Sequence, residues 1–224
     1  TENMAISISI VIKKLTLIIK KIKPDILIIY GDRFETLGAA IAGHENNILV
    51  GHLEGGDVTN GGTHDDNIRH SITKLSHFHF TTNTLSYNRV LALGEEKWRV
   101  KMVGFTAIDL IREKKFSDKK EVIKKYNLKK QNVVLLLTFH PLSFSLEKTK
   151  SEINNTLASI QDILNKFSVT CIFTYPNNDV GSEYIISKIK LLSKKHKNIK
   201  LYKSLGRRDY WGIMNLIKFN YKII

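Results

Sequence analysis

Short runs of apolar residues alternate along the chain with longer stretches in which apolar positions recur every three or four residues. Within residues 2–22, Ile8, Ile12 and Leu15 lie at helical spacing, and lysines occupy the other faces, which predicts an amphipathic helix. The next segment, Asp25–Tyr30, is a continuous apolar run after its first residue and is typical of a buried parallel strand.

The same rhythm continues to the end of the chain and predicts strands and helices in alternation. We predict strands at 25–30, 48–51, 79–82, 100–103, 133–138, 169–174 and 199–202. We predict helices at 2–22, 33–44, 65–77, 85–93, 106–113, 147–167, 182–196 and 208–217. This alternation is typical of an α/β fold in which helices cover parallel sheets.

A lysine-rich polar segment, residues 113–130, interrupts the rhythm, and we interpret it as the bridge between two domains. The predicted domains are residues 1–116 and residues 117–224. The chain starts inside a predicted helix and stops in an apolar stretch that resembles a strand. We therefore expect both domains to be incomplete parts of a longer protein.

The net charge of +14 would suit a nucleic-acid partner, but the distribution of the charge argues against one. Of the 35 basic residues 7 are arginine, and 20 of the 28 lysines lie after residue 110, in pairs on helix-like segments. Aromatic residues are not interleaved with these lysines, as a platform for stacked bases would require. Between Asp25 and Glu96 ten acids outnumber four basic residues. We expect no nucleic-acid partner and interpret the lysines as a solvated surface.

The single cysteine, Cys171, excludes an internal disulfide framework and fits a reducing compartment, so we expect a cytoplasmic protein. Lysines interrupt the longest apolar runs, so no segment resembles a transmembrane helix, and we expect no membrane partner.

Several polar residues stand just after predicted strands or on the loops that follow them, at the edge of a parallel sheet where loops converge and ligands bind. They are Asp32, Glu54, Asp65, Asp66, His140 and Asn177. A carboxylate on such a loop can serve as a general acid or a general base. The sequence therefore predicts an acidic cleft between two α/β domains, to which the second domain contributes the histidine and the asparagine.

Each of these acids also has a purely structural interpretation. Asp32 could cap the helix that follows it, because its side chain can accept from free backbone N–H groups. Glu54 could form an ion pair with Arg69. Asp65 and Asp66 could cap their own helix, whereas two adjacent like charges in a closed cleft would favour protonation of one of them.

Histidines and two helix starts suggest further sites. His77 and His79 would point to one face of a strand, but their spacing matches no zinc signature, and we expect no metal site. His140 stands at a strand end before a proline, and could be structural or functional. The helix starts at Ser182 and after Gly206 could each bind a phosphate group.

Five motifs occur in an order that resembles one enzyme family. They are GDRFE at Gly31–Glu35, HLEGGD at His52–Asp57, DDNIRHSITKLSH at Asp65–His77, FHP at Phe139–Pro141 and YPNND at Tyr175–Asp179. From about Pro24 to Tyr210 the chain resembles the hydrolysing UDP-N-acetylglucosamine 2-epimerases of sialic- and legionaminic-acid precursor pathways.

The resemblance implies a GT-B-like architecture, in which two Rossmann-like domains hold a UDP-sugar. It implies that UDP-GlcNAc, or a related UDP-2,4-diacetamido sugar, is converted to UDP and the free manno-configured sugar. The C2 proton is removed and UDP is eliminated, and water then adds at C1 while C2 is reprotonated from the opposite face. The family needs no metal or redox cofactor, and its members tend to dimerise, so we expect no cofactor and a homodimer.

By motif, the resemblance also implies which residues act. The predicted catalytic residues are Asp32, Glu54, Asp65 and His140. The predicted substrate-binding residues are Arg33, Asn177, Ser182 and Arg69. Their types suit the chemistry, because removal of a weakly acidic C2 proton needs a positioned base and the departing UDP needs stabilisation.

Two parts of the family pattern are absent from this chain: the N-terminal strand with its glycine–arginine loop, and a later serine- and glycine-rich segment. We therefore interpret the chain as an internal fragment of such an enzyme. The alternatives are a truncated, non-catalytic remnant that binds nucleotide sugars, and a metal-dependent hydrolase that uses the histidines and acids.

Overall fold

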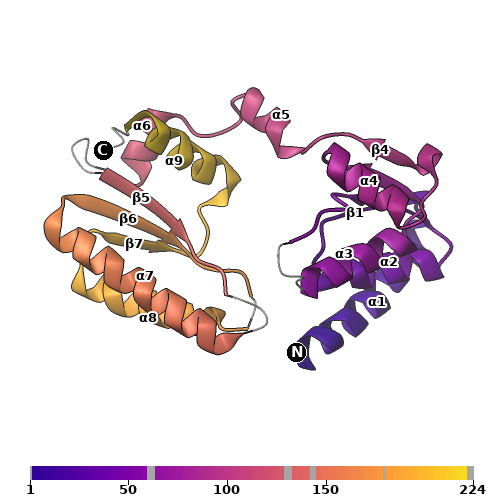
Figure 1. Ribbon diagram of the computed structural model, residues 1–224, viewed down its shortest axis with the longest axis horizontal. Helices are drawn as coiled ribbons and strands as arrows, with labels where there is room; N and C mark the ends of the chain where they lie inside the picture. Colours follow the sequence, from indigo (N-terminus) through magenta and orange to yellow (C-terminus); the bar gives the residue numbers. More distant parts are fainter. Residues whose placement is uncertain (1, 60–63, 129–132, 142–144, 179, 221–224) are drawn as a thin grey trace. The chain divides into compact units, whose positions relative to one another are not determined.

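The computed structural model describes residues 2–59, 64–128, 133–141, 145–178 and 180–220 as two compact units, Thr1–Ile108 and Asp109–Ile224 (Figure 1). We call them unit 1 and unit 2. The division lies in helix α5 (Ala107–Arg112), and the predicted domain boundary after residue 116 stays a prediction.

Unit 1 contains one parallel sheet with the strand order β1-β2-β3-β4. Its strands are β1 (Ile26–Tyr30), β2 (Leu49–Leu53), β3 (Phe78–Thr81) and β4 (Val100–Met102). Its helices are α1 (Glu2–Ile22), α2 (Phe34–Glu45), α3 (His64–Leu75), α4 (Thr84–Ala92) and the 3₁₀ turn η1 (Lys97–Arg99). One row of residues across the sheet runs Ile29, His52, His79 and Val100, so two histidines lie side by side in its centre.

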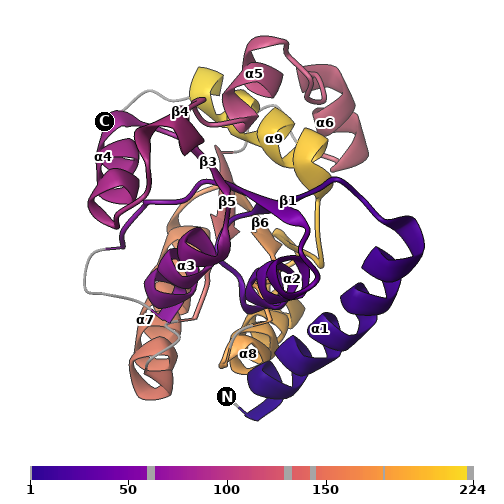
Figure 2. The same ribbon diagram turned by 90° about the vertical axis from the view of Figure 1, so that its right-hand side faces the viewer.

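Helices α2 and α3 cover one face of this sheet. Ile29 of β1 and Val50 of β2 pack there against Ala40 of α2 and against Ile68 and Ile72 of α3, and all five are buried. Helix α1 lies against α2 rather than against the sheet (Figures 1 and 2). The strands are arranged in sequence order, so every right-handed crossover runs in the same direction across the sheet. Helices in such crossovers lie on one side of the sheet.

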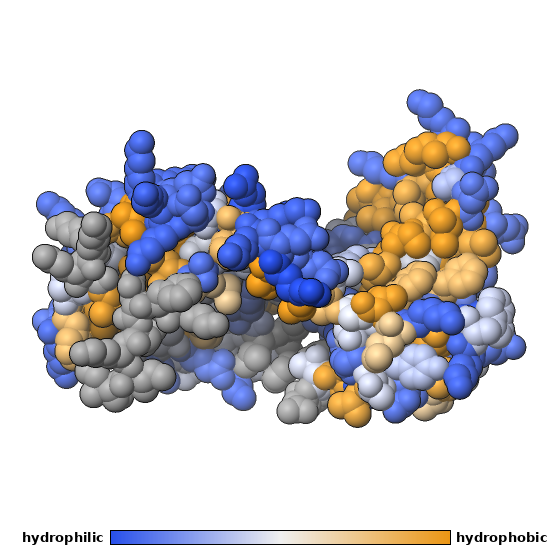
Figure 3. Space-filling model, turned by 90° about the horizontal axis from the view of Figure 1, so that it is seen from above, coloured by the Kyte–Doolittle hydropathy of each residue, from blue (hydrophilic) through white to orange (hydrophobic). Residues whose placement is uncertain are grey.

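The other face of the same sheet is open to solvent along β1 and at the start of β2. Ile26, Ile28 and Tyr30 alternate along β1 on that face and are 40%, 51% and 51% exposed, and Leu49 of β2 beside them is 43% exposed. Exposed apolar residues gather over unit 1 in one view of the molecular surface (Figure 3, right-hand side). The prediction that β1 is buried on both faces is therefore wrong: β1 is an edge strand, and only Ile29 is buried.

Unit 2 contains a second parallel sheet with the order β5-β6-β7. Its strands are β5 (Val133–Thr138), β6 (Val169–Thr174) and β7 (Ile199–Tyr202). Its helices are α6 (Lys119–Lys125), α7 (Leu146–Lys166), α8 (Ser182–Lys195) and α9 (Gly206–Asn220).

Both faces of this second sheet are covered (Figure 1). The central strand β6 is buried along its whole length, and its side chains alternate between two apolar clusters. Cys171 and Phe173 pack against α7 and α8, whereas Ile172 packs against α6 and α9. The free cysteine is therefore a core residue, and its burial raises the pKa of the thiol to about 11.

Helix α6 lies inside the lysine-rich segment that we interpreted as a bridge, so that interpretation is wrong for this part of the chain. Asp118 accepts a hydrogen bond from the backbone N–H of Glu121, whose side chain accepts from the backbone N–H of Asp118; this capping box starts the helix. Val122, Tyr126 and Leu128 are buried against the sheet and α9. The surrounding lysines hide this apolar spacing in the sequence.

The remaining elements match the predicted α/β alternation, with one further correction at the end of the chain. Helix α9 continues to Asn220, so the predicted strand-like ending is wrong up to that residue, and residues 221–224 lie outside the described ones. None of the described helices combines the length and apolarity needed to cross a lipid bilayer.

Because α6 contributes to the core, we expect Val122→Ala to lower the free energy of unfolding by about 2 kcal/mol through the lost methyl groups and the cavity left behind. Urea denaturation of the chain measures this change. The matched control is Lys119→Ala at an exposed position of the same helix, which we expect to stay within about 0.5 kcal/mol of the wild type. Equal denaturation midpoints for Val122→Ala and the wild type would show that α6 does not pack as described.

Candidate active site

The carboxyl ends of β1 and β2 bring two predicted catalytic acids close together. Glu54 directly follows β2, and Asp32 stands two residues after the neighbouring strand β1. The backbone ladder continues past both strands, since the N–H of Gly31 donates to the carbonyl of Leu53 at 3.1 Å and the N–H of Glu54 donates to that of Phe80 at 2.9 Å. The ends of two adjacent strands therefore carry the two carboxylates.

Arg69 on α3 joins the segments that carry these acids. Its Nη2 donates to Asp32 Oδ2, and its Nη1 donates to Asp66 Oδ1 at 2.6 Å and to the backbone carbonyl of Asp57 at 2.7 Å. The arginine is 7% exposed. One buried guanidinium therefore balances two carboxylates and also holds the loop after β2.

These contacts overturn two of the structural interpretations. Asp32 does not cap the following helix, because the N-cap of α2 is Arg33, which makes no side-chain capping bond. Glu54 does not pair with Arg69, because α3 turns the guanidinium toward Asp32 and Asp66.

The two acids at the start of α3, Asp65 and Asp66, differ in how far their side chains are exposed to solvent. Asp66 is 6% exposed and accepts from the backbone N–H of Thr59 as well as from Arg69. Burial alone would raise the pKa of Asp66, but these hydrogen bonds hold it below its usual value. The alternative in which one member of the pair is protonated therefore does not apply to Asp66. Asp65, the predicted catalytic member, is exposed.

Glu54 has a different partner. The hydroxyl of Tyr30, at the end of β1, donates to Glu54 Oε1 at 2.5 Å. Partial burial, together with the hydrogen bond and the charge of Glu54, raises the pKa of Tyr30 to about 12. The backbone of Glu54 has a φ of +67°, a left-handed conformation that non-glycine residues adopt rarely and mostly where other contacts impose it.

His52 fixes the turn that leads to Asp32. The side chain is fully buried, and burial lowers its pKa to about 4, so the imidazole is neutral at physiological pH. Its Nε2 lies 2.9 Å from the carbonyl of Gly31, which can only accept, so Nε2 carries the proton. Its Nδ1 lies 3.2 Å from the hydroxyl oxygen of Thr73. The histidine next to the Glu54 loop is therefore a structural donor.

Helix α4 holds the glycine-rich turn after Glu54. Gly56 has a φ of +87°, and a Cβ there would lie 2.3 Å from the carbonyl oxygen of Ser86, so only glycine fits. The hydroxyl of Ser86 donates to Asp57 Oδ1, and Arg89 donates to the carbonyl of Gly56 at 3.1 Å. The sequence gives no signal for Ser86 and Arg89, because their roles depend on how α4 packs.

His77 and His79 of unit 1 have structural partners. His79 is fully buried and contacts Glu95 at 3.1 Å, and Glu95 is also paired with Lys74 and Arg99. His77 precedes β3, and its Nδ1 accepts from the backbone N–H of Val50 at 3.0 Å. The prediction that His77 and His79 share one face of a strand is therefore wrong. Among the described residues, no group of three or more His, Cys, Asp or Glu side chains is placed to hold a metal ion.

In unit 2 the predicted residues gather at the carboxyl ends of β5 and β6. The backbone N–H of Asn177 donates to Nδ1 of His140 at 3.3 Å, so these two residues lie together. Ser182 is the first residue of α8 and follows Gly181, whose close neighbours include Pro141. A cavity of about 370 Å³ is lined by His140, Thr138, Thr174, Tyr175, Lys203, Ser204, Leu205, Gly206, Arg207, Tyr210 and Trp211.

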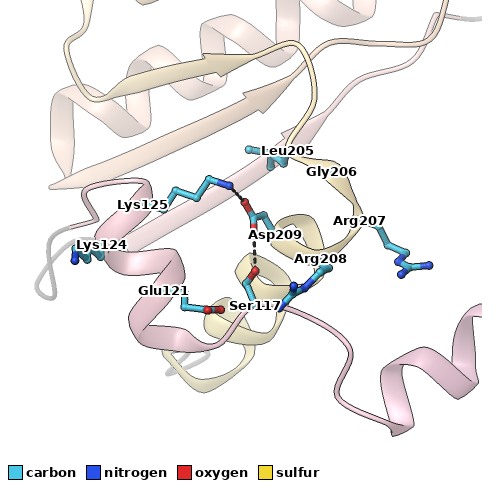
Figure 4. Close-up of a pocket in the computed structure, with 9 residues that line it drawn as sticks. All are labelled: Ser117, Glu121, Lys124, Lys125, Leu205, Gly206, Arg207, Arg208 and Asp209. Atoms are coloured by element: carbon cyan, nitrogen blue, oxygen red, sulfur yellow. Dashed lines mark hydrogen bonds and ion pairs between the residues drawn. The ribbon is translucent and has the colours of Figure 1, made fainter.

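The start of α9, which lines this cavity, is fixed by Asp209 (Figure 4). Its carboxylate accepts from Ser117 Oγ and Lys125 Nζ at 2.5 Å and from the hydroxyl of Tyr126 at 2.6 Å. These donors outweigh the effect of burial and lower the pKa of Asp209 to about 2. The network borders a second cavity of about 830 Å³, whose lining includes Arg207 and Lys124.

The predicted site residues thus form one group in each unit. Asp32, Glu54 and Arg69 lie together in unit 1, and His140 and Asn177 lie together in unit 2. Arg33 is exposed and pairs with Glu35 at 3.0 Å. The roles of all eight predicted residues stay predictions at this point.

Comparisons with known proteins identify relatives along nearly the whole chain. The sequence profile described as UDP-N-acetylglucosamine 2-epimerase matches residues 1–219. A GDP/UDP-N,N'-diacetylbacillosamine 2-epimerase (hydrolyzing) of Campylobacter jejuni is 35% identical over 88% of this chain and 50% of its own length. A UDP-N,N'-diacetylbacillosamine 2-epimerase (hydrolyzing) of Legionella pneumophila is 30% identical over 84% of this chain and 48% of its own. The chain spans about half the length of the curated relatives it matches.

Solved structures share the fold. A UDP-GlcNAc 2-epimerase from Neisseria meningitidis, bound to UDP-GlcNAc, superposes with a TM-score of 0.74 at 24% identity, over 92% of this chain and 56% of that one. The enzyme from Methanocaldococcus jannaschii, in complex with UDP-GlcNAc and UDP, gives a TM-score of 0.71 at 17% identity, over 92% of this chain and 57% of that one. The predicted fold class, α/β with two Rossmann-like, GT-B-like units, is confirmed.

We expect Arg69→Gln to destabilise the chain by about 3 kcal/mol, because it leaves Asp32 and the buried Asp66 without their shared cation. Urea denaturation measures the loss. The control is Arg33→Gln, since the pair of Arg33 with Glu35 is 45% and 44% exposed and contributes little. A loss no larger than that of the control would contradict the central role of Arg69.

The Asp209 network predicts an acid-dependent stability. The carboxylate has a pKa of about 2 in the folded chain and about 4 when unfolded, so it stabilises above pH 4 and loses this contribution as the pH falls toward 2. The stability difference between wild type and Asp209→Asn should therefore shrink from neutral pH to about pH 2, as measured by denaturation at several pH values. We expect no such trend for Asp162→Asn on the exposed surface of α7, and a constant difference for Asp209→Asn would contradict the account.

Proposed function

The chain belongs to the UDP-N-acetylglucosamine 2-epimerase family, and from this premise we propose that its protein is a hydrolysing UDP-sugar 2-epimerase. The proposed substrate is UDP-GlcNAc or a related UDP-2,4-diacetamido sugar, and the products are UDP and the free manno-configured sugar. The names of the Campylobacter and Legionella relatives support a diacetamido substrate and a hydrolysing reaction. The proposed product would serve the synthesis of sialic- or legionaminic-acid-type sugars, which the name of a 32% identical Escherichia coli relative, "Polysialic acid biosynthesis protein P7", supports.

One observation carries this proposal: two carboxylates in different environments stand side by side at adjacent strand ends. Asp32 is paired with a buried guanidinium, and its side chain is 29% exposed. Glu54 is hydrogen-bonded to a neutral phenol. Acids whose environments differ in this way suit a reaction that removes one proton and delivers another.

In the proposed reaction a carboxylate takes the C2 proton, and the electrons of the C–H bond form the C1–C2 double bond as UDP leaves with the C1–O bond pair. Water then adds at C1 and loses a proton, while C2 gains a proton on the opposite face. We propose that Asp32, Glu54 and Asp65 handle these protons. His140, Arg33, Asn177 and Ser182 are proposed to contact UDP or to help it leave.

Arg69, predicted as a substrate contact, takes another role in this proposal. Its guanidinium already donates to Asp32, Asp66 and the carbonyl of Asp57, so it acts by holding Asp32 in place. The proposed steps transfer protons and break or form a C–O bond at C1, so none of them needs an oxidant or a reductant.

We also propose a cytoplasmic homodimer. The buried, free Cys171 fits a reducing compartment. The half-exposed apolar side chains of Ile26 and Ile28 in unit 1 are a surface that needs covering in the whole protein. Light scattering during size-exclusion chromatography distinguishes a dimer from a monomer.

The second candidate is a non-catalytic protein that binds nucleotide sugars. Calorimetric binding of UDP without any turnover of either sugar would support this candidate over the epimerase.

For the epimerase we expect the protein expressed from its complete gene to release UDP and to incorporate solvent deuterium at C2, as seen by NMR. Glu54→Gln removes a proton-handling carboxylate and should lower kcat by about 100-fold or more with little change in stability. The control Glu96→Gln changes an acid that pairs with Arg99 at the surface, and should leave kcat unchanged. If neither UDP-GlcNAc nor the diacetamido sugar gives UDP or deuterated product, the proposal is wrong.

A further inference from the structure

Tyr30 ends strand β1 in a position that the five sequence motifs do not include. In the sheet register it pairs with Leu53, the residue before Glu54, so the two side chains come from neighbouring strand ends. The phenol hydroxyl donates to Glu54 Oε1 at 2.5 Å. The other oxygen, Oε2, has no hydrogen bond to the described residues.

Tyr30 differs from a tyrosine that serves only the core. Tyr126 is 4% exposed and gives its hydroxyl to the Asp209 network inside unit 2. Tyr30 is 51% exposed, on the open face of the sheet in unit 1. A phenol that is accessible and yet bonded to one specific carboxylate is unusual for packing alone, and is common where a reactive group is held in place.

The protonation of Tyr30 suits a permanent donor. Partial burial and the neighbouring Glu54 keep its pKa near 12, and the charge of Asp32 acts in the same direction. The hydroxyl therefore keeps its proton throughout the physiological range. A hydrogen bond to one oxygen restricts the rotation of a carboxylate group. The second oxygen then points in a defined direction.

We propose that Tyr30 is a positioning residue for Glu54: its hydroxyl holds Oε1 so that Oε2 faces the proton exchanged with the substrate. This inference rests on the proposed function, because it assumes that Glu54 handles that proton. The inference adds Tyr30, the last residue of β1, to the site. Tyr30 supports Glu54, and Asp32 follows two residues later in the chain.

The kinetic test uses the complete enzyme. Tyr30→Phe removes the hydroxyl and keeps the ring, so we expect kcat to fall about 10-fold with KM changed less than about 2-fold. In a Glu54→Gln background the same change should cause no further loss, because the effect of Tyr30 passes through Glu54. The control Tyr87→Phe, on α4, should leave kcat unchanged. An equal loss from Tyr30→Phe in both backgrounds would overturn the proposal.

A second test does not depend on turnover. With tyrosines labelled at Cζ with ¹³C, NMR follows the ionisation of Tyr30 in the chain as the pH rises. Glu54→Gln removes the adjacent negative charge and should lower the pKa of Tyr30 from about 12 toward the ordinary value near 10. An unchanged Tyr30 titration would overturn the pairing itself. A lowered pKa together with an inactive wild-type enzyme would instead overturn the proposed function.

Discussion

The ion pairs of Arg69 are the interaction on which the site in unit 1 depends. One guanidinium on α3 donates to Asp32 after β1, to the loop after β2 through the carbonyl of Asp57, and to Asp66 on its own helix. Three segments that are separate in sequence are therefore fixed relative to one another by one side chain. Because the arginine is buried, its charge must be balanced, and the carboxylates of Asp32 and Asp66 balance it at close range.

Further hydrogen-bond donors complete this arrangement. His52 gives its Nε2 proton to the carbonyl of Gly31 beneath Asp32, and Ser86 and Arg89 of α4 hold the turn that follows Glu54. Asp32 and Glu54 stay partly accessible, while His52, Arg69 and Ser86, which support their segments, are buried. Unit 2 uses the same principle at Asp209, whose buried carboxylate fixes the start of α9 beside the cavity that His140 lines.

The sequence predicts most of the fold, because apolar runs and helical spacing report burial directly: β5, β6 and β7 match their predicted bounds residue for residue. It also predicts which acids stand at strand ends. It fails where tertiary packing decides the outcome. The lysines of α6 conceal Val122, and the edge position of β1 exposes a face that an apolar run alone would bury. The choice of Asp32 rather than Glu54 as partner of Arg69 depends on the rotation of α3, which no spacing reveals.

The central claim is that the carboxylates after β1 and β2 act on the sugar ring of a UDP-sugar. A crystal structure of the complete protein with UDP-GlcNAc or the UDP-diacetamido sugar bound tests this most directly. The account predicts that Asp32 and Glu54 lie within contact distance of C1 or C2 of the sugar, with Tyr30 still bonded to Glu54. A sugar ring that touches neither carboxylate would contradict the account.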